Sequence, residues 1–384
     1  MNPSYLIASL GLEKLPQCDL HALRAPSPQW CGAVSALTTA VLGEAFPQLP
    51  LVAPLPVLRP RGSRTHFTTA GIQLLETVSS ARETVRHMVT QPCIRMQFAP
   101  HVCEGTSSSF VLFNVVATNA SETEFVLLIS QMLSLFHRCG LAMDRMRFRV
   151  SDGATKWSTK NASRNALLFS RTALEIFYGS LQLGEAIYVH DYPINDFERV
   201  KVSDVGFSIE RLNWAMFPAA PYMIGFDETY ASQALGSADA TCRVIDCIRS
   251  AVLIAGEGVR PSGSVEAGVR FREYMSLLWE RTKDVRVCFS SLGECSTRYW
   301  SAWGWRPSVA TAKIIDLLKL EYERHMNLHL LGVVRRELGI RLGGKVDCSW
   351  ELFLKRTEQS LPGWARPKLR HIVSVDKILR MHTC

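Results

Sequence analysis

The stretch that most constrains the fold is residues 201–214, with the sequence Lys-Val-Ser-Asp-Val-Gly-Phe-Ser-Ile-Glu-Arg-Leu-Asn-Trp. It begins with alternating apolar and polar residues, contains Gly206, and continues with apolar residues at helical spacing. Alternation predicts a half-buried strand, and the later spacing predicts an amphipathic helix. The sequence therefore predicts a strand that runs directly into a helix.

This junction also has the chemistry of a nucleotide site. Gly206 lets another group approach the backbone closely, and the first helical turn offers unpaired N–H groups. Arg211 presents a planar fork of donors suited to phosphate, and Asp204 can hold an ammonium group. Taken alone, such a junction is more often a packing feature than a binding site, so the prediction depends on the rest of the chain.

Four segments together resemble the alanyl-tRNA synthetase family. Ser203-Asp-Val-Gly-Phe-Ser-Ile-Glu-Arg211 resembles the Asp-Thr-Gly-Met-Gly-Leu-Glu-Arg signature of the third class II motif. Gln91-Pro-Cys-Ile-Arg95 resembles the strand Gln-Arg-Cys-Val-Arg that opens the second motif, and residues 173–178 resemble Thr-Glu-Ile-Phe-Tyr-Asp. The most specific match is residues 242–262, which resemble the start of the family's helical, tRNA-recognising domain.

The resemblance implies an α+β fold: a class II synthetase antiparallel sheet flanked by helices, followed by an all-helical domain. We place the boundary so that residues 1–235 form the catalytic domain and residues 236–384 the helical domain. The helix-then-strand order over residues 32–58 resembles the first class II motif, and apolar spacing predicts an amphipathic helix over residues 72–89.

The resemblance also assigns nucleotide-binding roles. Arg95 matches the arginine that holds the α-phosphate of ATP and offsets the charge that builds up during attack. Arg211 is the second phosphate-binding, catalytic arginine. Glu175, Gly206 and Glu210 are the further candidates for contact with ATP and Mg²⁺, and no zinc motif is expected.

Asp204 and Glu185 are the candidates for binding the amino group of an amino acid. Residues 183–190 fall where the family has Ile-Trp-Asn-Leu-Val-Phe-Met-Gln, so Glu185 replaces an asparagine and Gly184 replaces a tryptophan. These changes predict a larger pocket of different charge and a substrate other than alanine. The family's His-His-Thr-Phe-Phe-Glu-Met run is also missing after Arg95, where the hydroxyl-rich residues 105–109 either cap phosphates or form a flexible loop.

The segment after residue 236 offers candidate RNA contacts. Arg270 and Arg272 either bind tRNA or form a solvated helix face, and we weigh the two equally. The aromatic residues 299–305 suit a domain seam better than base stacking. His325 and His329 lie four apart, but a solvated helix face is favoured over a zinc site.

The composition narrows the cellular compartment and the kinds of binding partner that we expect. The 384 residues contain 11 cysteines with no Cys-x-x-Cys pair, which indicates free thiols and not a disulfide framework. No apolar run reaches the roughly 18 residues that a membrane helix needs, so we expect a cytoplasmic protein with no membrane partner. The net charge of +8 permits a nucleic-acid partner without requiring one.

The leading hypothesis is ATP-dependent amino-acid activation through an aminoacyl-adenylate, with transfer to tRNA. The lack of a segment long enough for an editing domain suggests a specialised paralogue, in secondary metabolism. The acceptor is alternatively a carrier protein or a small molecule. A non-catalytic protein that binds amino acid or tRNA as a regulator is the competing class.

Overall fold

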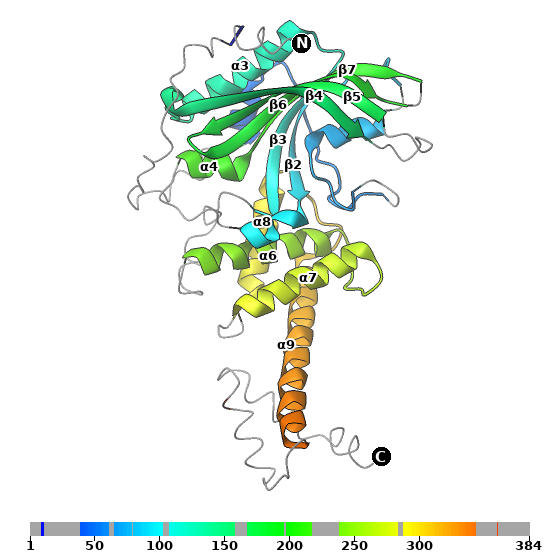
Figure 1. Ribbon diagram of the computed structural model, residues 1–384, viewed down its shortest axis with the longest axis vertical. Helices are drawn as coiled ribbons and strands as arrows, with labels where there is room; N and C mark the ends of the chain where they lie inside the picture. Colours follow the sequence, from blue (N-terminus) through cyan, green and yellow to red (C-terminus); the bar gives the residue numbers. More distant parts are fainter. Residues whose placement is uncertain are drawn as a thin grey trace.

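The computed structural model describes residues 9–10, 39–60, 65–78, 80–102, 107–157, 167–195, 197–216, 238–282, 287–342 and 359. These residues form an α+β fold with one seven-stranded sheet (Figure 1). The strands are β1 (Leu51–Val52), β2 (Arg86–Ile94), β3 (Ser109–Thr118), β4 (Met146–Trp157), β5 (Leu167–Tyr178), β6 (Leu181–Pro193) and β7 (Arg199–Ser208). The helices are α2 (Thr39–Ala45), α3 (Glu122–Arg138), α4 (Ile209–Met216), α6 (Ala238–Gly256), α7 (Glu266–Thr282), α8 (Phe289–Ala302) and α9 (Thr311–Leu342). The short 3₁₀ helices are η3 (Gly71–Thr77), η4 (Met96–His101) and η5 (Met143–Arg145).

The strand order in the sheet is β1-β2-β3-β7-β6-β5-β4. Only the first pair is parallel, and the other pairs are antiparallel. The helix-then-strand order expected before residue 58 is present, because α2 precedes the short edge strand β1. The mostly antiparallel sheet with helices agrees with the class of fold that the sequence predicts.

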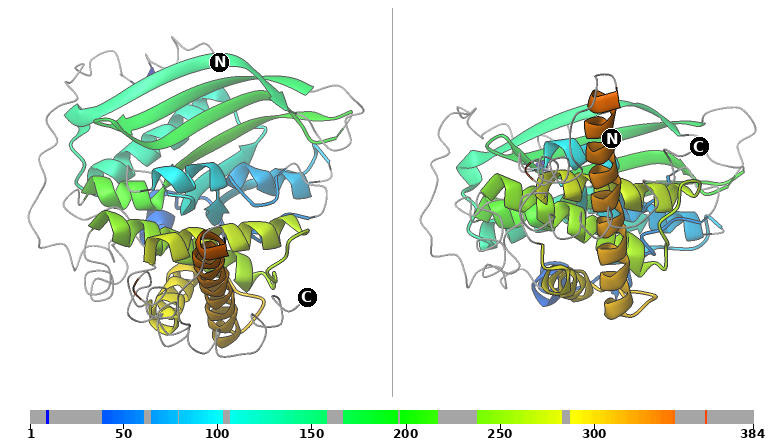
Figure 2. Two further views of the ribbon diagram at one scale, coloured as in Figure 1. Left: turned by 60° about the horizontal axis from the view of Figure 1, so that its bottom comes forward. Right: turned by 90° about the horizontal axis from the view of Figure 1, so that it is seen from below.

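Helix α3 covers one face of the sheet (Figures 1 and 2). Its start is capped by Ser121, whose hydroxyl accepts a hydrogen bond from the Glu124 backbone N–H at 3.1 Å. The core on this face combines sheet and helix residues: Phe113, Val115, Ile176, Tyr188, Val205, Phe207, Phe125, Ile129, Met132 and Phe136. Because side chains alternate along a strand, the neighbours of these sheet residues point to the opposite face.

The opposite face is covered in part by η3, and here the sequence prediction was wrong. The helix expected over residues 72–89 is limited to η3, and strand β2 begins at Arg86. Residues 86–94 pair along the whole of β3, from Arg86 opposite Ala117 to Ile94 opposite Ser109. Cross-strand pairing in the folded chain outweighs the local helical spacing of this segment.

Strand β7 runs directly into α4, as the sequence predicts. Ser208 ends the strand, and its hydroxyl accepts a hydrogen bond from the Arg211 backbone N–H at 3.4 Å, which caps the helix. Gly206 lies inside the strand and not at the junction.

Helices α6, α7 and α8 lie together beside the sheet, and α9 extends away from it (Figure 1). The aromatic residues 299–305 are buried where α8 meets the sheet: Trp300 is fully buried, and the Thr90 hydroxyl on β2 donates to the Trp303 carbonyl at 2.9 Å. The prediction that this cluster is core, not a base-stacking surface, is confirmed.

A buried carboxylate joins the sheet to these helices. Glu210, at the start of α4, is 3% exposed and accepts hydrogen bonds from the Val111 backbone N–H at 2.9 and 3.0 Å. Arg249 of α6 donates to it at 3.2 Å, and the Tyr299 hydroxyl of α8 donates at 2.5 Å. Burial, with the nearby Glu210 charge, raises the pKa of Tyr299 well above its ordinary value, so the phenol remains a donor.

A second buried carboxylate makes a parallel connection. Asp246 of α6 accepts hydrogen bonds from the backbone N–H groups of Ser108 and Ser109 at 2.9 and 3.2 Å, and from the Ser108 hydroxyl. Asp246 and Arg249 lie three residues apart, so they share one face of α6. That face docks on the β3 end of the sheet.

Removing the cation of the first connection should destabilise the fold. Arg249→Met leaves Glu210 buried without its cation, which costs about 3–5 kcal/mol. The control is Arg86→Met, which breaks a half-exposed ion pair with Glu124 worth less than about 1 kcal/mol. Urea unfolding measures the free energy of unfolding of both variants. A similar decrease in the two would contradict the role assigned to Arg249.

Candidate functional site

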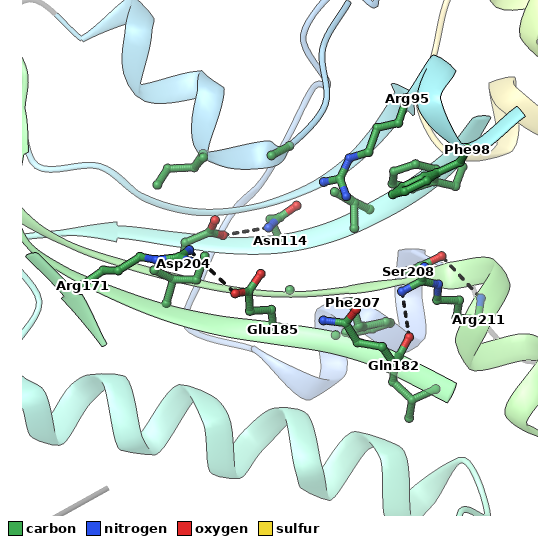
Figure 3. A pocket seen from close by; sticks show the side chains of 18 of the residues that line it. Arg95, Phe98, Asn114, Arg171, Gln182, Glu185, Asp204, Phe207, Ser208 and Arg211 are labelled. Carbon is green, nitrogen blue, oxygen red and sulfur yellow. Dashed lines mark hydrogen bonds and ion pairs between the residues drawn. The ribbon is translucent and has the colours of Figure 1, made fainter. Parts of the chain in front are cut away.

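A cavity of about 260 Å³ lies on the face of the sheet opposite α3, beneath η3 (Figure 3). Five of the residues predicted from the sequence line it: Arg95, Glu185, Asp204, Gly206 and Arg211. Glu185 comes from β6, Asp204 and Gly206 from β7 and Arg211 from α4, while Arg95 directly follows β2. The pairing of these strands brings the five residues together. The site is therefore a property of the sheet and not of a single loop.

The strand register arranges the lining residues in rows. One row runs Asn114 on β3, Gly206 on β7 and Glu185 on β6, each opposite the next. The adjacent row on the same face runs Val116, Asp204 and Ile187. Arg211 lies toward the α4 end of the cavity, and Arg171 on β5, opposite Val189, lies toward the other end (Figure 3).

Arg95 lies just beyond the end of β2. Its guanidinium donates to the Thr69 carbonyl at 2.7 and 3.1 Å and lies 5.1 Å from the centre of the Phe110 ring. Burial lowers the pKa of Arg95, and the nearby Arg211 charge acts in the same direction. Two guanidinium groups that repel each other in a partly enclosed space favour an anion between them.

Arg211 is positioned by an irregularity in β6. The register between β5 and β6 shifts at Ile176 and Phe177, so Gln182 and Gly184 both pair while Leu183 forms the bulge. The Gln182 carbonyl then accepts a hydrogen bond from Arg211 at 2.9 Å. Bulges beside functional sites commonly re-aim a group in this way.

Asp204 is a buried carboxylate held by an amide. Asn114 donates a hydrogen bond to it at 2.7 Å, and Asp204 is 6% exposed. Burial raises the pKa of Asp204 to about 7, opposed by the Asn114 hydrogen bond and helped by the Glu185 charge. Asn114 was not a candidate from the sequence, although an asparagine among the apolar residues of β3 was the available signal.

Glu185 and Glu175 are cross-strand neighbours with different surroundings. Glu185 lines the cavity 3.8 Å from an Arg171 nitrogen, and burial raises its pKa. Glu175 lies outside the cavity lining in an ion pair with Arg149, whose hydrogen bond lowers the pKa of Glu175. The structure therefore brings Glu185 to the site and leaves Glu175 beside it.

The glycines of the site serve close packing within the protein. A Cβ at Gly206 would lie 2.5 Å from Asn114 Nδ2, so the group that approaches this backbone is the Asn114 amide. A Cβ at Gly184 would lie 2.3 Å from the Gly206 carbonyl. The space expected from a missing tryptophan at position 184 is thus occupied by β7.

Three further sequence candidates lie away from the cavity. Glu210 is enclosed by the donors described above and does not line the cavity. Arg270 and Arg272 lie on α7, where Arg270 pairs with Glu266 and Glu273, and Arg272 lies 3.4 Å from Glu321. Arg270 lines a separate, wider hollow of about 700 Å³ between α7 and η4.

The serine residues that follow Arg95 also form hydrogen bonds within the protein. The backbone N–H groups of Ser108 and Ser109, which the sequence offered as phosphate caps, bind Asp246. Residues 103–106 of that loop lie outside the described part of the chain.

The described residues contain neither a metal-binding cluster nor a helix suited to a membrane. No cluster of three or more His, Cys, Asp or Glu side chains among them is arranged to hold a metal ion. His325 lies 3.4 Å from Glu321 and is part of no such cluster. None of the helices in the described residues has the length and apolar character to cross a membrane.

The close packing at Gly206 predicts that a larger residue at this position destabilises the protein. Gly206→Ala should destabilise the protein by about 1–3 kcal/mol and displace the Asn114 amide, because the new Cβ also lies 2.7 Å from the Phe113 carbonyl. Gly43→Ala in α2 is the control, since its Cβ meets nothing within 4 Å and favours the helix by about 0.5–1 kcal/mol. Melting temperatures that fall equally in both variants would show that the packing at Gly206 is not tight.

The raised pKa of Asp204 predicts a pH-dependent stability. The native carboxyl keeps its proton up to about pH 7, whereas the unfolded one releases it near 3.8. The native state therefore binds more protons between these values, so its stability falls as the pH rises through them, by roughly 4 kcal/mol in total. The side chain of the Asp204→Asn variant cannot ionise, so the variant does not lose stability in this way as the pH rises.

The measurement is the melting temperature of wild type and Asp204→Asn without ligand, from pH 5 to pH 8. We expect the melting temperature of Asp204→Asn to rise relative to that of the wild type as the pH rises. The exposed Asp144→Asn serves as the control. A constant difference across this range would show that Asp204 does not titrate there.

Comparisons with known proteins show only limited similarity, and only to solved structures. No protein-family model and no curated protein matches the sequence. Two structures of pyrrolysyl-tRNA synthetase from Desulfitobacterium hafniense resemble the chain, at 11% and 13% identity with TM-scores of 0.32 and 0.31. Each match covers 48% of this chain and 72% of the other protein. These two neighbours are class II aminoacyl-tRNA synthetases, and they do not confirm the alanyl assignment expected from the sequence.

Proposed function

We propose that the cavity binds an amino acid and the phosphates of ATP and joins them as an aminoacyl-adenylate. The observation that carries this proposal is that a buried carboxylate and a pair of arginines lie toward opposite ends of one enclosed space, where a third arginine, Arg171, lies at the carboxylate end, 3.8 Å from Glu185. The buried Asp204 carboxylate is held by an amide, and within the described residues no cation pairs with it. Two arginines, Arg95 and Arg211, lie toward the other end of the same cavity.

An amino acid fits this pattern because its two charged groups have opposite signs. Its ammonium group would neutralise Asp204, with Glu185 close by, and would lower the raised pKa values of both acids. Its carboxylate would then point toward Arg95. This arrangement holds the reacting carboxylate beside the place where the arginines hold the α-phosphate.

The reaction is a displacement at phosphorus. A carboxylate oxygen of the amino acid attacks the α-phosphorus of ATP, the bond from that phosphorus to the bridging oxygen breaks, and pyrophosphate leaves with the electron pair. Negative charge builds up on the α-phosphate oxygens, and Arg95 and Arg211 are already oriented to stabilise it by Thr69, Phe110 and Gln182.

Mg²⁺ would enter with the ATP phosphates. Mg²⁺ is commonly held by one or two carboxylates together with substrate phosphates. Glu175 was expected from the sequence to contact the ion, but its carboxylate is paired with Arg149 and lies outside the cavity lining. The described residues therefore offer the ion little beyond the phosphates themselves, and Mg²⁺ would serve mainly to neutralise them.

Transfer of the aminoacyl group to tRNA is the finer part of the proposal. It is supported by the resemblance of residues 242–262 to the tRNA-recognising domain of alanyl-tRNA synthetases, and would make this chain a specialised, cytoplasmic paralogue. The pairing of Arg270 and Arg272 with carboxylates does not favour RNA contact at these two residues. Helices α6 to α9 would belong to the proposed helical domain of residues 236–384.

A non-catalytic amino-acid-binding protein is the second candidate. It is favoured by the segment around Ser108, which stands where the family carries its histidine and glutamate run and here docks α6. Both candidates bind an amino acid at Asp204. They differ only in whether the α-phosphate of ATP reacts.

Amino-acid-dependent exchange of pyrophosphate into ATP tests the proposal. We expect exchange with at least one amino acid, a loss of about 10²–10³-fold in Arg95→Ala, and only partial recovery in Arg95→Lys, which lacks the planar fork. Arg86→Ala, in a half-exposed ion pair away from the cavity, is the control and should keep full exchange.

The outcomes separate the candidates. Exchange that survives in Arg95→Ala would contradict the role of this arginine. If amino acids stabilise the protein against heat but support no exchange, the non-catalytic candidate is correct.

A further inference from the structure

We infer that Asn114 is a positioning residue for the amino-acid substrate, because its amide holds the Asp204 carboxylate ready for an ammonium group and is itself held by the first residue of η3. This inference rests on the proposed function, since it takes Asp204 as the site of the α-ammonium group. It gives a role to a side chain that the resemblance to alanyl-tRNA synthetases does not single out.

The Asn114 amide forms a hydrogen bond at each end. Its Nδ2 donates to an Asp204 carboxylate oxygen at 2.7 Å, and its Oδ1 accepts from the Gly71 backbone N–H at 3.2 Å. Gly71 is the first residue of η3, and both Asn114 and Asp204 line the cavity. One side chain therefore connects the proposed ammonium site with η3.

Only one orientation of this amide suits the Gly71 backbone. An N–H group donates and cannot accept, so the amide oxygen must face Gly71 and the amide nitrogen is left to face Asp204. With the amide reversed, its NH₂ group would meet the Gly71 N–H, and neither could accept a hydrogen bond. The amide is thus fixed as a donor to Asp204, and such a donor favours the ionised carboxylate.

Two glycines bring backbone close to both sides of the amide. A Cβ at Gly71 would lie 2.6 Å from Asn114 Oδ1, and a Cβ at Gly206 would lie 2.5 Å from its Nδ2. Asn114 is buried and lies directly opposite Gly206, with Asp204 two residues away on the same strand. Close packing on both sides holds the amide in the orientation that its hydrogen bonds require.

The Asn114 hydrogen bond determines how much of Asp204 is ionised near neutral pH. Burial raises the pKa of Asp204 to about 7, and the nearby Glu185 charge acts in the same direction, whereas the Asn114 hydrogen bond opposes them. Without Asn114 the pKa of Asp204 would lie higher still. The acid would then be neutral at the pH where an ammonium group needs it charged.

The charged groups that line the cavity with Asp204 act differently from the amide. Glu185 on β6 carries the same sign as Asp204, and its ion pair with Arg171 on β5 is at 3.8 Å. Arg95 and Arg211 lie toward the other end of the cavity (Figure 3). In the ligand-free protein, the amide is therefore the described neighbour whose hydrogen bond stabilises the ionised form of Asp204.

Two further titratable side chains belong to this part of the sheet, and both are neutral near pH 7. Burial raises the pKa of Tyr192 on β6, and the charges of Asp204 and of Glu76 on η3 act in the same direction. Burial lowers the pKa of His87 on β2, which lies in the same row across the sheet as Asp204. Glu185 also has a raised pKa, so the test must separate it from Asp204.

The pH dependence of the melting temperature without ligand tests the connection between Asn114 and Asp204. Because the native pKa of Asp204 is raised, its contribution to stability is lost as the pH rises, and fully lost above that pKa, which is about 7 in the wild type. Asn114→Leu keeps the branched shape but cannot donate, so its melting temperature should continue to fall between pH 7 and pH 9. Adding Asp204→Asn to both proteins should remove this difference, which excludes Glu185 as its source.

Pyrophosphate exchange tests the positioning role. The probes are the standard amino acid that gives the fastest exchange in the wild type and its analogue in which hydrogen replaces the α-amino group. At pH 7, Asn114→Leu should raise the KM for the amino acid by about 10–100-fold, the effect of losing a hydrogen bond to a charged group. The KM for ATP and inhibition by the analogue should change little. The rise in KM should shrink toward pH 9, where Asp204 ionises in the variant as well.

Two variants control for effects on folding. Asn114→Ala is smaller and should behave as Asn114→Leu does, which guards against a poor fit of the leucine. Thr90→Val is the matched control, because it loses one buried hydrogen bond, to the Trp303 carbonyl, outside the cavity lining. It should lower the melting temperature without changing the pH dependence or the KM for the amino acid.

The outcomes separate the inference from the proposed function. Asn114 variants that follow the wild-type pH curve would overturn the inference and leave adenylation intact. Equal losses of affinity for the amino acid, ATP and the analogue would show a structural role only, and would also overturn it. If no amino acid supports exchange but the ligand-free curves differ as expected, adenylation is wrong and the control of Asp204 by Asn114 is supported.

Discussion

The structure depends on one buried carboxylate. Glu210 accepts hydrogen bonds from the β3 backbone, from Arg249 on α6 and from Tyr299 on α8. A charge this deeply buried is tolerated only when several donors surround it, so these elements must meet in one geometry. The next residue in the chain is Arg211, which lines the cavity. The network that joins the sheet to the helices therefore also fixes one wall of the site.

The site follows from this geometry and from alternation along strands. One set of side chains packs on α3, and the other set carries Asn114, Asp204 and Glu185 into the cavity. Glycine at position 206 leaves room for the Asn114 amide of β3 to reach Asp204 on the neighbouring strand β7. The result is a buried acid whose charge is incompletely compensated by the described residues. A ligand with an ammonium group is the physical complement of such an acid.

Several sequence predictions followed from local patterns. Alternation and helical spacing predicted the strand-to-helix junction of residues 201–214, and the spacing of aromatic residues 299–305 suited a buried seam. The helix predicted over residues 72–89 failed because β3 offers β2 a full set of backbone partners. Local propensity differs little between such alternatives, and pairing decides between them.

The sequence by itself determined which residue types were available: the arginines at 95 and 211 and the acids at 185 and 204. It indicated a phosphate and amino-acid site through the order of these residues. Only the tertiary structure separated Glu210, which binds the helices, from Asp204, which faces the cavity, although both lie within the same short segment. The reason is that burial and partners depend on which distant strands and helices pack around each side chain, and residue spacing along the chain does not record that.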